Sequence, residues 1–221
     1  MLRTLSQLQD RLDAEMGWRV KEMAEVKARI QGTSGARQTT MTRAGIVLLY
    51  AHWEGFVKSC AMAYIEFVVS QRHTLNELAE CFVAMCAKGR INDFVSSNKA
   101  QVHIETVRFF VTAMGQQATI SMAMDKIVDA ESNLGSKVLE NILNTVGFDA
   151  ARYSNYYKFI DERLVKTRNS IAHGENTYRN GIEGDTRATW YGEMQSETIK
   201  LMEFIKTDIE NAAYGKQYLR S

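Results

Sequence analysis

One short segment brings together side chains that suit phosphate chemistry: Arg168-Asn169-Ser170-Ile171-Ala172-His173. Arginine stays charged at physiological pH, and the imidazole of histidine titrates near neutrality. Such a pair can hold a phosphate group and move a proton. A structural role is the alternative, because a histidine in the last turn of a helix is stabilised by the helix dipole, and an arginine there can simply pair with a carboxylate. The segment is a candidate site, and whether its role is functional or structural depends on the helices that carry it.

The composition favours an all-helical protein. The 221 residues include no proline, whereas folds with many turns or strand edges usually contain several. Apolar residues recur at spacings of three and four, which is typical of amphipathic helices. The pattern predicts helices over residues 2–30, 42–71, 74–88, 100–117, 136–146, 151–172 and 193–213. The candidate segment then ends the sixth of these helices, with Gly174 behind it as a helix-terminating residue.

The connections follow from turn residues. Residues 31–40 are rich in Gly, Ser and Thr and are expected to form a flexible linker. Thr74-Leu75-Asn76-Glu77 has the form of a capping box that opens the third helix, and Gly89 is expected to end it. The polar stretch 175–191 is expected to be a loop beside the site. We expect a single domain over residues 1–221, with an N-terminal amphipathic helix over 1–30 and a bundle core over 42–213.

Charge and motif content exclude several classes of protein. The 27 Lys and Arg residues nearly balance the 26 Asp and Glu residues, so any contact with nucleic acid must be local. The three cysteines lie in apolar stretches, and the chain lacks Cys-x-x-Cys, His-Glu-x-x-His and glycine-rich phosphate loops. We therefore expect no metal and no cofactor. Charged residues interrupt every apolar run and no signal peptide is recognisable, which predicts a cytoplasmic protein without a membrane partner.

Two separate stretches carry a family resemblance. Arg168 to His173, at the end of an apolar helix, resembles the Arg-polar-x-x-x-His signature of the HEPN superfamily. The stretch Leu48 to Lys58, which reads LLYAHWEGFVK, resembles the early helix of a bacterial, MAE-like HEPN subfamily. The two stretches occur in the expected order on a helical chain. The resemblance implies an up-and-down helical bundle of the HEPN type that dimerises through its motif helices.

The resemblance also implies an activity, that of a metal-independent endoribonuclease. Arg168 would hold the scissile phosphate, His173 would act as general base or acid, and Asn169 would orient the phosphate or the imidazole. Because the ribose 2'-OH is an internal nucleophile, a charge clamp and a positioned acid or base suffice. On an ideal helix, Arg168 and His173 point about 140° apart, so one helix cannot aim both at one phosphate. Dimerisation would solve this by bringing the arginine of one chain to the histidine of the other.

Further residues are weaker candidates. If Glu54 faces the cleft, it is expected to orient His173 or Arg168, whereas an ordinary surface pair with Lys58 is the alternative. His52 is expected at the edge of the core and Trp53 within it. Tyr178 and Arg179, just beyond the motif, are candidate RNA-binding residues.

The sequence leaves three functions open. The first is a ribonuclease that acts as the toxin or effector of a bacterial toxin-antitoxin or antiphage system, with RNA and an antitoxin or defence-system protein as partners. The second is a non-catalytic HEPN module that binds RNA or a partner protein. The third is a helical interaction protein in which Arg168 and His173 are structural.

Overall fold

The computed structural model describes residues 2–119, 128, 133–175 and 186–220, and this part of the chain is helical apart from connections and two isolated β-bridges. The predicted all-α class is confirmed. The helices, in chain order, are α1 (Leu5–Gln31), α2 (Gly35–Ser70), α3 (Glu80–Ser96), α4 (Ala100–Thr112), α6 (Ser136–Thr145), α7 (Ser154–Lys158), α8 (Lys166–Ala172) and α9 (Thr186–Tyr214).

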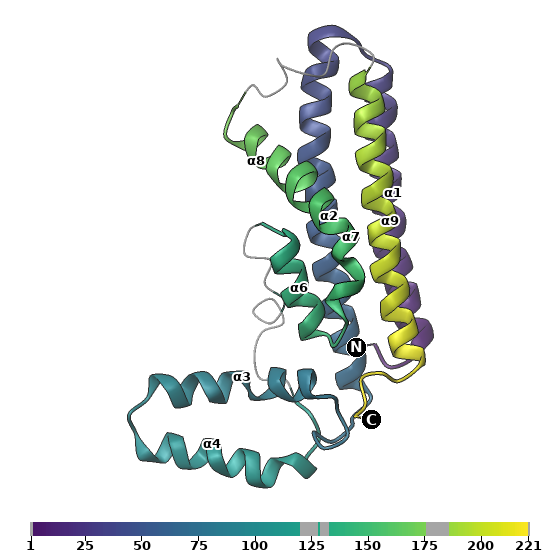
Figure 1. The fold of residues 1–221 in the computed structure, drawn as a ribbon. Coiled ribbons are helices and arrows are strands. Elements are labelled where there is room, and N and C mark those ends of the chain that lie inside the picture. Colours follow the sequence, from purple (N-terminus) through teal and green to yellow (C-terminus); the bar gives the residue numbers. More distant parts are fainter. Residues whose placement is uncertain (1, 120–127, 129–132, 176–185, 221) are drawn as a thin grey trace.

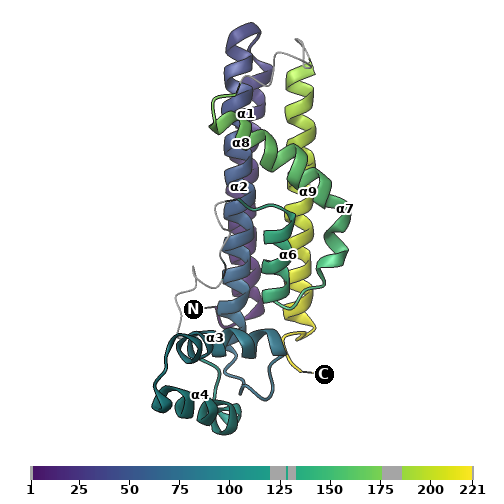
Figure 2. The ribbon, with the colours of Figure 1, turned by 60° about the vertical axis from the view of Figure 1, so that its left-hand side comes forward.

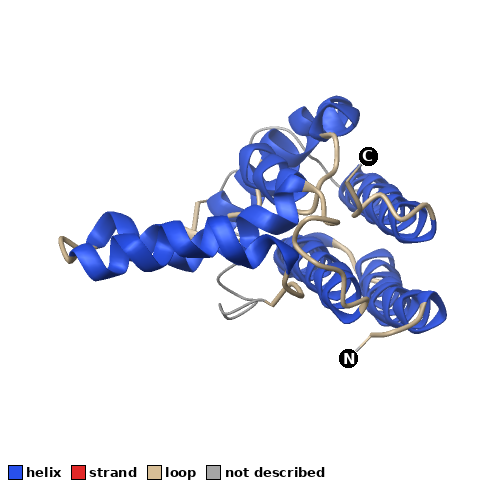
Figure 3. Ribbon diagram, turned by 90° about the horizontal axis from the view of Figure 1, so that it is seen from below, coloured by secondary structure: helices blue, strands red, loops and turns tan. Residues whose placement is uncertain are grey.

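Three long helices form the body of the molecule. α1, α2 and α9 run side by side, and α8 slants across α2 (Figures 1 and 2). α7 lies toward α9, where the ring centres of Tyr156 and Phe204 are 6.3 Å apart, and α6 lies near α7. α3 and α4 form a hairpin that projects from one end of the bundle, near both termini (Figures 1 and 3). α2 is central and is buried on much of its surface, as its broad apolar pattern predicts. None of the described helices is long and apolar enough to cross a membrane.

The start of α2 differs from the predicted linker over 31–40. α2 begins at Gly35, soon after α1 ends at Gln31. The buried side chain of Gln38 donates to the carbonyl oxygens of Ile30 (3.3 Å) and Thr33 (2.9 Å). A polar residue that was expected in a linker thus provides hydrogen bonds to carbonyl groups at the C-terminal end of α1. The prediction was wrong because this pairing is invisible in the local sequence.

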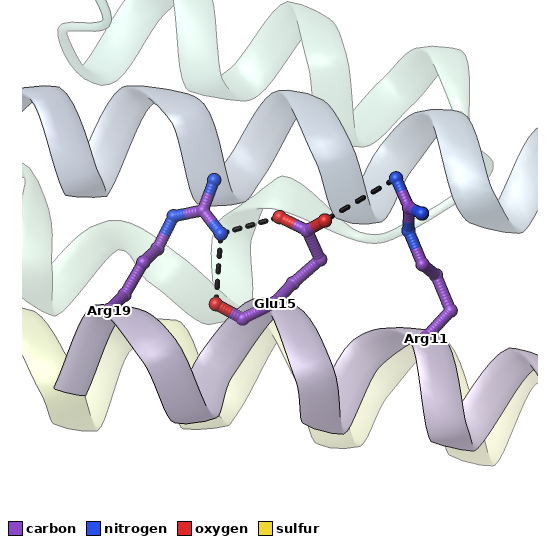
Figure 4. A network of polar contacts seen from close by, with 3 residues as sticks. All are labelled: Arg11, Glu15 and Arg19. Carbon is purple, nitrogen blue, oxygen red and sulfur yellow. Dashed lines mark hydrogen bonds and ion pairs between the residues drawn. The ribbon is translucent and has the colours of Figure 1, made fainter. Parts of the chain in front are cut away.

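A charged cluster on α1 lies at its contact with α2. Glu15 accepts hydrogen bonds from Arg19 and pairs with Arg11 at 3.3 Å, and Arg19 also donates to the Glu15 carbonyl oxygen at 2.8 Å (Figure 4). A Cβ atom at Gly55 of α2 would lie 3.2 Å from Arg19 Nη2. The small residue at position 55 therefore lets α2 lie against a buried guanidinium.

The third helix also differs from its prediction. Thr74 and Glu77 do interact, since the Thr74 amide and hydroxyl both donate to Glu77 Oε2, but no helix starts there. The Leu75 amide bonds to the Gln116 carbonyl, and the Arg220 amide bonds to the Glu77 carbonyl. Because other segments take these backbone groups, α3 begins only at Glu80.

The predicted stop at Gly89 was wrong as well, and α3 continues to Ser96. The helix beyond Gly89 packs against α4, where the Arg90 guanidinium lies 4.7 Å from the centre of the Phe109 ring. A glycine inside a helix costs only about 1 kcal/mol, which tertiary packing readily offsets.

The helix that carries the motif is not one regular α-helix over 151–172. It consists of the 3-10 turn η2 (Ala150–Tyr153), α7, the π-helical segment η3 (Phe159–Val165) and α8. Within η3, Ile160 and Leu164 are fully buried. The Asp161 carboxylate accepts hydrogen bonds from the Ser136 amide (2.7 Å) and hydroxyl, so it caps α6. This local change of helical winding sets the direction in which α8 leaves the core.

His52 lies at the contact between α2 and α1, where its side chain is 3% exposed and its Nε2 lies 2.9 Å from Glu22 Oε2. Burial lowers the pKa of His52, and nearby Arg19 adds to this, while Glu22 opposes both. The unfolded chain therefore binds a proton at a higher pH than the folded chain. As the pH falls below about 6.5, the folded state should lose stability.

Urea denaturation at pH 7.5 and 5.5 tests this prediction. The free energy of unfolding of the wild type should fall between the two values, and that of His52→Gln should fall less, because the variant has lost this titration. All other ionisable groups are the same in both proteins, so their contribution cancels in the comparison. An equal fall in both would contradict the assignment to His52.

Candidate functional site

A hollow of about 640 Å³ lies between α2 and α8. Its polar lining includes Tyr50, Glu54 and Lys58 of α2 and Arg168 of α8. Two of the predicted site residues, Arg168 and Glu54, are thus brought to one surface although they are far apart in the sequence. The two stretches that carry the family resemblance meet here.

Arg168 is held in place by two neighbours. Its guanidinium carbon lies 4.0 Å from the centre of the Tyr50 ring, and its Nη1 donates a 2.8 Å hydrogen bond to Asn169 Oδ1. A stacked arginine of this kind gains about 0.5–2 kcal/mol from the ring. Asn169 was predicted to orient the phosphate or the imidazole, whereas the group that it contacts here is Arg168, so its role stays a prediction. The guanidinium is held at the edge of the hollow.

Tyr50 is a site residue that sequence reasoning missed, since its pattern assigned it to the core. Its hydroxyl accepts a hydrogen bond from the Leu134 amide and is also hydrogen-bonded to Glu54. Burial, together with the Glu54 carboxylate, raises the pKa of Tyr50 to about 12, against the opposing effects of the Leu134 bond and Arg168. Tyr50 thus stays protonated near neutral pH. The available signal was the four-residue spacing of Tyr50 and Glu54, which places them on one face of a helix.

Glu54 therefore has a partner inside the site. It is half-buried, it is bonded to Tyr50, and it lines the hollow together with Lys58. Tyr50 thus contacts both Glu54 and Arg168, which joins the three side chains in one cluster. His52 and Trp53 of the same stretch do not line the hollow: both are buried, and Trp53 Nε1 donates to the Leu134 carbonyl oxygen at 3.2 Å.

His173 lies apart from the hollow. It is the exposed residue that ends α8, and the lining of the hollow on this side stops at Ala172. Arg168 and His173 thus diverge within one chain, as their five-residue separation predicts. Arg43 of α2 donates a 2.9 Å hydrogen bond to the Glu175 carbonyl oxygen, which ties the turn after His173 to the bundle.

Gly174 closes the helix as predicted. Its φ is +75°, its amide bonds to the Ile171 carbonyl (3.1 Å), and the Glu175 amide bonds to the Ser170 carbonyl (2.9 Å). This is the Schellman pattern, in which a left-handed residue follows the last helical turn.

Gly174→Ala should therefore destabilise the protein by about 1 kcal/mol, because a side chain disfavours positive φ. Thermal or urea denaturation measures the effect. Glu175→Ala is the matched control, since that side chain is exposed and the contacts described for this residue use its backbone amide and carbonyl oxygen. Equal stability of Gly174→Ala and the wild type would show that the turn relaxes without strain.

The remaining predicted residues, Tyr178 and Arg179, lie outside the described residues. Within the described part of the chain, no group of three or more His, Cys, Asp or Glu residues is placed to hold a metal ion.

The fold is a helical bundle, as the HEPN resemblance implies, and α8 with the candidate segment crosses the central helix α2. The model of one family, RiboL-PSP-HEPN, matches residues 14–211, and the chain belongs to this family. Neither the curated proteins nor the solved structures provide a match. The superfamily prediction is thus confirmed, whereas the narrower MAE-like assignment stays a prediction. Membership places the chain among nuclease and RNA-binding modules.

Proposed function

We propose that this protein is a metal-independent endoribonuclease whose active site forms between two copies of the chain. The observation that carries the proposal is the divergence of an oriented Arg168 and an exposed His173 at the end of one helix. A two-fold axis near α8 would bring each arginine to the partner's histidine. The chain would act as one HEPN-like domain.

In the proposed reaction, the Arg168 guanidinium binds the scissile phosphate and stabilises the charge that develops on its oxygens. The partner's His173 takes the proton of the ribose 2'-OH while this oxygen attacks phosphorus. The imidazolium formed in this way then gives its proton, directly or through a water molecule, to the 5'-oxygen as the bond from phosphorus to that oxygen breaks. The products are a 2',3'-cyclic phosphate and a 5'-hydroxyl end. Asn169 and, through Tyr50, Glu54 are positioning residues for Arg168.

Single-stranded RNA is the expected substrate, because the 2'-OH must align opposite the leaving oxygen, which an A-form duplex hinders. Tyr178 and Arg179 remain candidate contacts for bases and phosphates. As the wider role, we propose a toxin or effector in a bacterial toxin-antitoxin or antiphage system. Support for that role is limited to the family resemblance, and growth arrest on expression of the wild type in bacteria tests it.

Incubation of purified wild type with total RNA in EDTA tests the activity. We expect fragments that end in 2',3'-cyclic phosphate. Arg168→Ala should lose about 100-fold or more in rate, as expected for removal of a phosphate clamp. Arg163→Ala is the matched control, because Arg163 lies in the same helical stretch but pairs with Glu193 at 3.5 Å, outside the hollow. RNA retention without cleavage would instead support the non-catalytic binding module. If Arg168→Ala chiefly lowers the melting temperature, the arginine is structural.

A further inference from the structure

The hairpin of α3 and α4 has an inner side and an outer side. Its helices contact each other through Arg90 and Phe109, and through the rings of Phe94 and His103, whose centres are 4.4 Å apart. Thr106 of α4 is buried on this inner side, with Val102 and Phe109 half-buried beside it. The hairpin projects from the bundle, so the outer side of α4 faces away from the body (Figures 1 and 3).

The outer side of α4 carries an apolar stripe. Ile104, Val107 and Val111 are 51%, 56% and 75% exposed. Their spacings of three and four place them on one face, about 100–160° from Thr106. A face of this kind normally packs against another helix. We call Ile104, Val107 and Val111 the α4 stripe.

The exposed apolar area of α4 has the size of a functional patch. Phe110 next to the stripe is also 43% exposed. At roughly 100 Å² for each of these four side chains, α4 exposes about 400 Å², within the ~300–600 Å² of the largest apolar patch of a monomer, which is often functional.

The polar residues beside the stripe indicate which partner fits. Glu105 and Arg108 lie along the same side of it, and Gln101 donates a 2.9 Å hydrogen bond to Glu105 Oε1. When two identical helices pack antiparallel, this side of one helix meets the same side of the other. A two-fold axis midway between Ile104 and Val111 places Glu105 within one turn of the partner's Arg108. The charges are thus self-complementary, whereas an RNA or an anionic membrane would require a basic rim.

We propose that the α4 stripe is a self-association surface, on which two copies of the chain pack their α4 helices antiparallel about a two-fold axis. This contact is separate from the proposed catalytic one, because α8 and α4 lie toward opposite ends of the molecule (Figure 1). A chain with two such self-complementary surfaces assembles beyond a dimer, into a closed tetramer or an open filament.

Sedimentation velocity of the full chain over a range of concentrations tests the proposal. Val107→Asp should raise the dissociation constant of this contact by about 100-fold or more, because it places two carboxylates within an apolar interface. Its melting temperature should change little, since residue 107 is exposed in the single chain. Asn98→Asp is the matched control, because it adds the same charge to the exposed connection of the hairpin.

A charge exchange tests the antiparallel register. Glu105→Arg and Arg108→Glu should each weaken association by about 3–10-fold, and the double variant should restore it. If the double variant is as weak as the single ones, the antiparallel register is wrong. If Val107→Asp sediments like the wild type at every concentration, the α4 stripe does not associate and the proposal is overturned.

The same experiment separates this proposal from the proposed function. Val107→Asp should keep its rate of RNA cleavage, because α4 is not part of the catalytic site. A wild type that sediments as a dimer and becomes monomeric with Val107→Asp would support the α4 contact and contradict the catalytic dimer. A wild-type dimer that stays dimeric with Val107→Asp would contradict the α4 contact and support the catalytic dimer.

Discussion

His173→Ala should lower the rate of RNA cleavage by about 100- to 10,000-fold, which is the usual contribution of a general acid or base. Because one histidine is expected to serve both as base and as acid, the loss should lie toward the upper end of this range. His173 is exposed and its side chain is not part of the core, so the variant should fold with unchanged stability. Initial rates on a defined RNA in EDTA measure the effect.

The control for this variant is Glu175→Ala, which removes another exposed side chain from the same turn and should cleave RNA at the wild-type rate. Circular dichroism and melting temperatures should agree for all three proteins. Equal cleavage by His173→Ala and the wild type would show that the histidine is not catalytic. Gel-shift binding to the same RNA should survive the substitution, since Arg168 remains.

Mixing two inactive variants should restore cleavage. In a composite site, the arginine comes from one chain and the histidine from the other. A dimer of one Arg168→Ala chain and one His173→Ala chain therefore has one site that lacks both residues and one that keeps both. An equal mixture forms such dimers half of the time, so it should recover about one quarter of the wild-type rate.

This complementation separates a composite site from a site within one chain. If each chain holds its own complete site, both sites of the mixed dimer lack a residue, and the mixture stays as inactive as its components. The matched control is a mixture of His173→Ala with the double variant Arg168→Ala/His173→Ala, which should recover nothing. The two variants should be mixed under conditions in which dimers exchange subunits, and light scattering measures that exchange.

The sequence contains enough local information for the fold class. The absence of proline and the three-to-four spacing of apolar residues predict helices, and these helices exist because their apolar faces bury one another. The local signals predicted the wrong structure at positions where a distant segment takes up the hydrogen-bonding groups. Gln38 caps α1 in place of a linker, and the backbone around Thr74 bonds to residues near both 115 and 219 in place of a helix.

The start of α9 shows the same competition. The polar stretch predicted as a loop reached residue 191, but α9 begins at Thr186. Tyr191 is fully buried, and its ring lies so close to α2 that a Cβ at Gly45 would come within 2.9 Å of it. A tyrosine in a polar stretch gives no local sign of such a contact.

For the candidate site, three features follow from the sequence alone: the residue types, the divergence of Arg168 and His173 on a helix, and the end of that helix at Gly174. They do so because helical geometry and the conformational freedom of glycine are local properties. The contact of Arg168 with the Tyr50 ring, and the hollow that it shares with Glu54, are visible only in the tertiary structure. These contacts join helices more than 100 residues apart in the chain. The π-helical segment and the burial of α2 set them, and both depend on how the whole bundle packs.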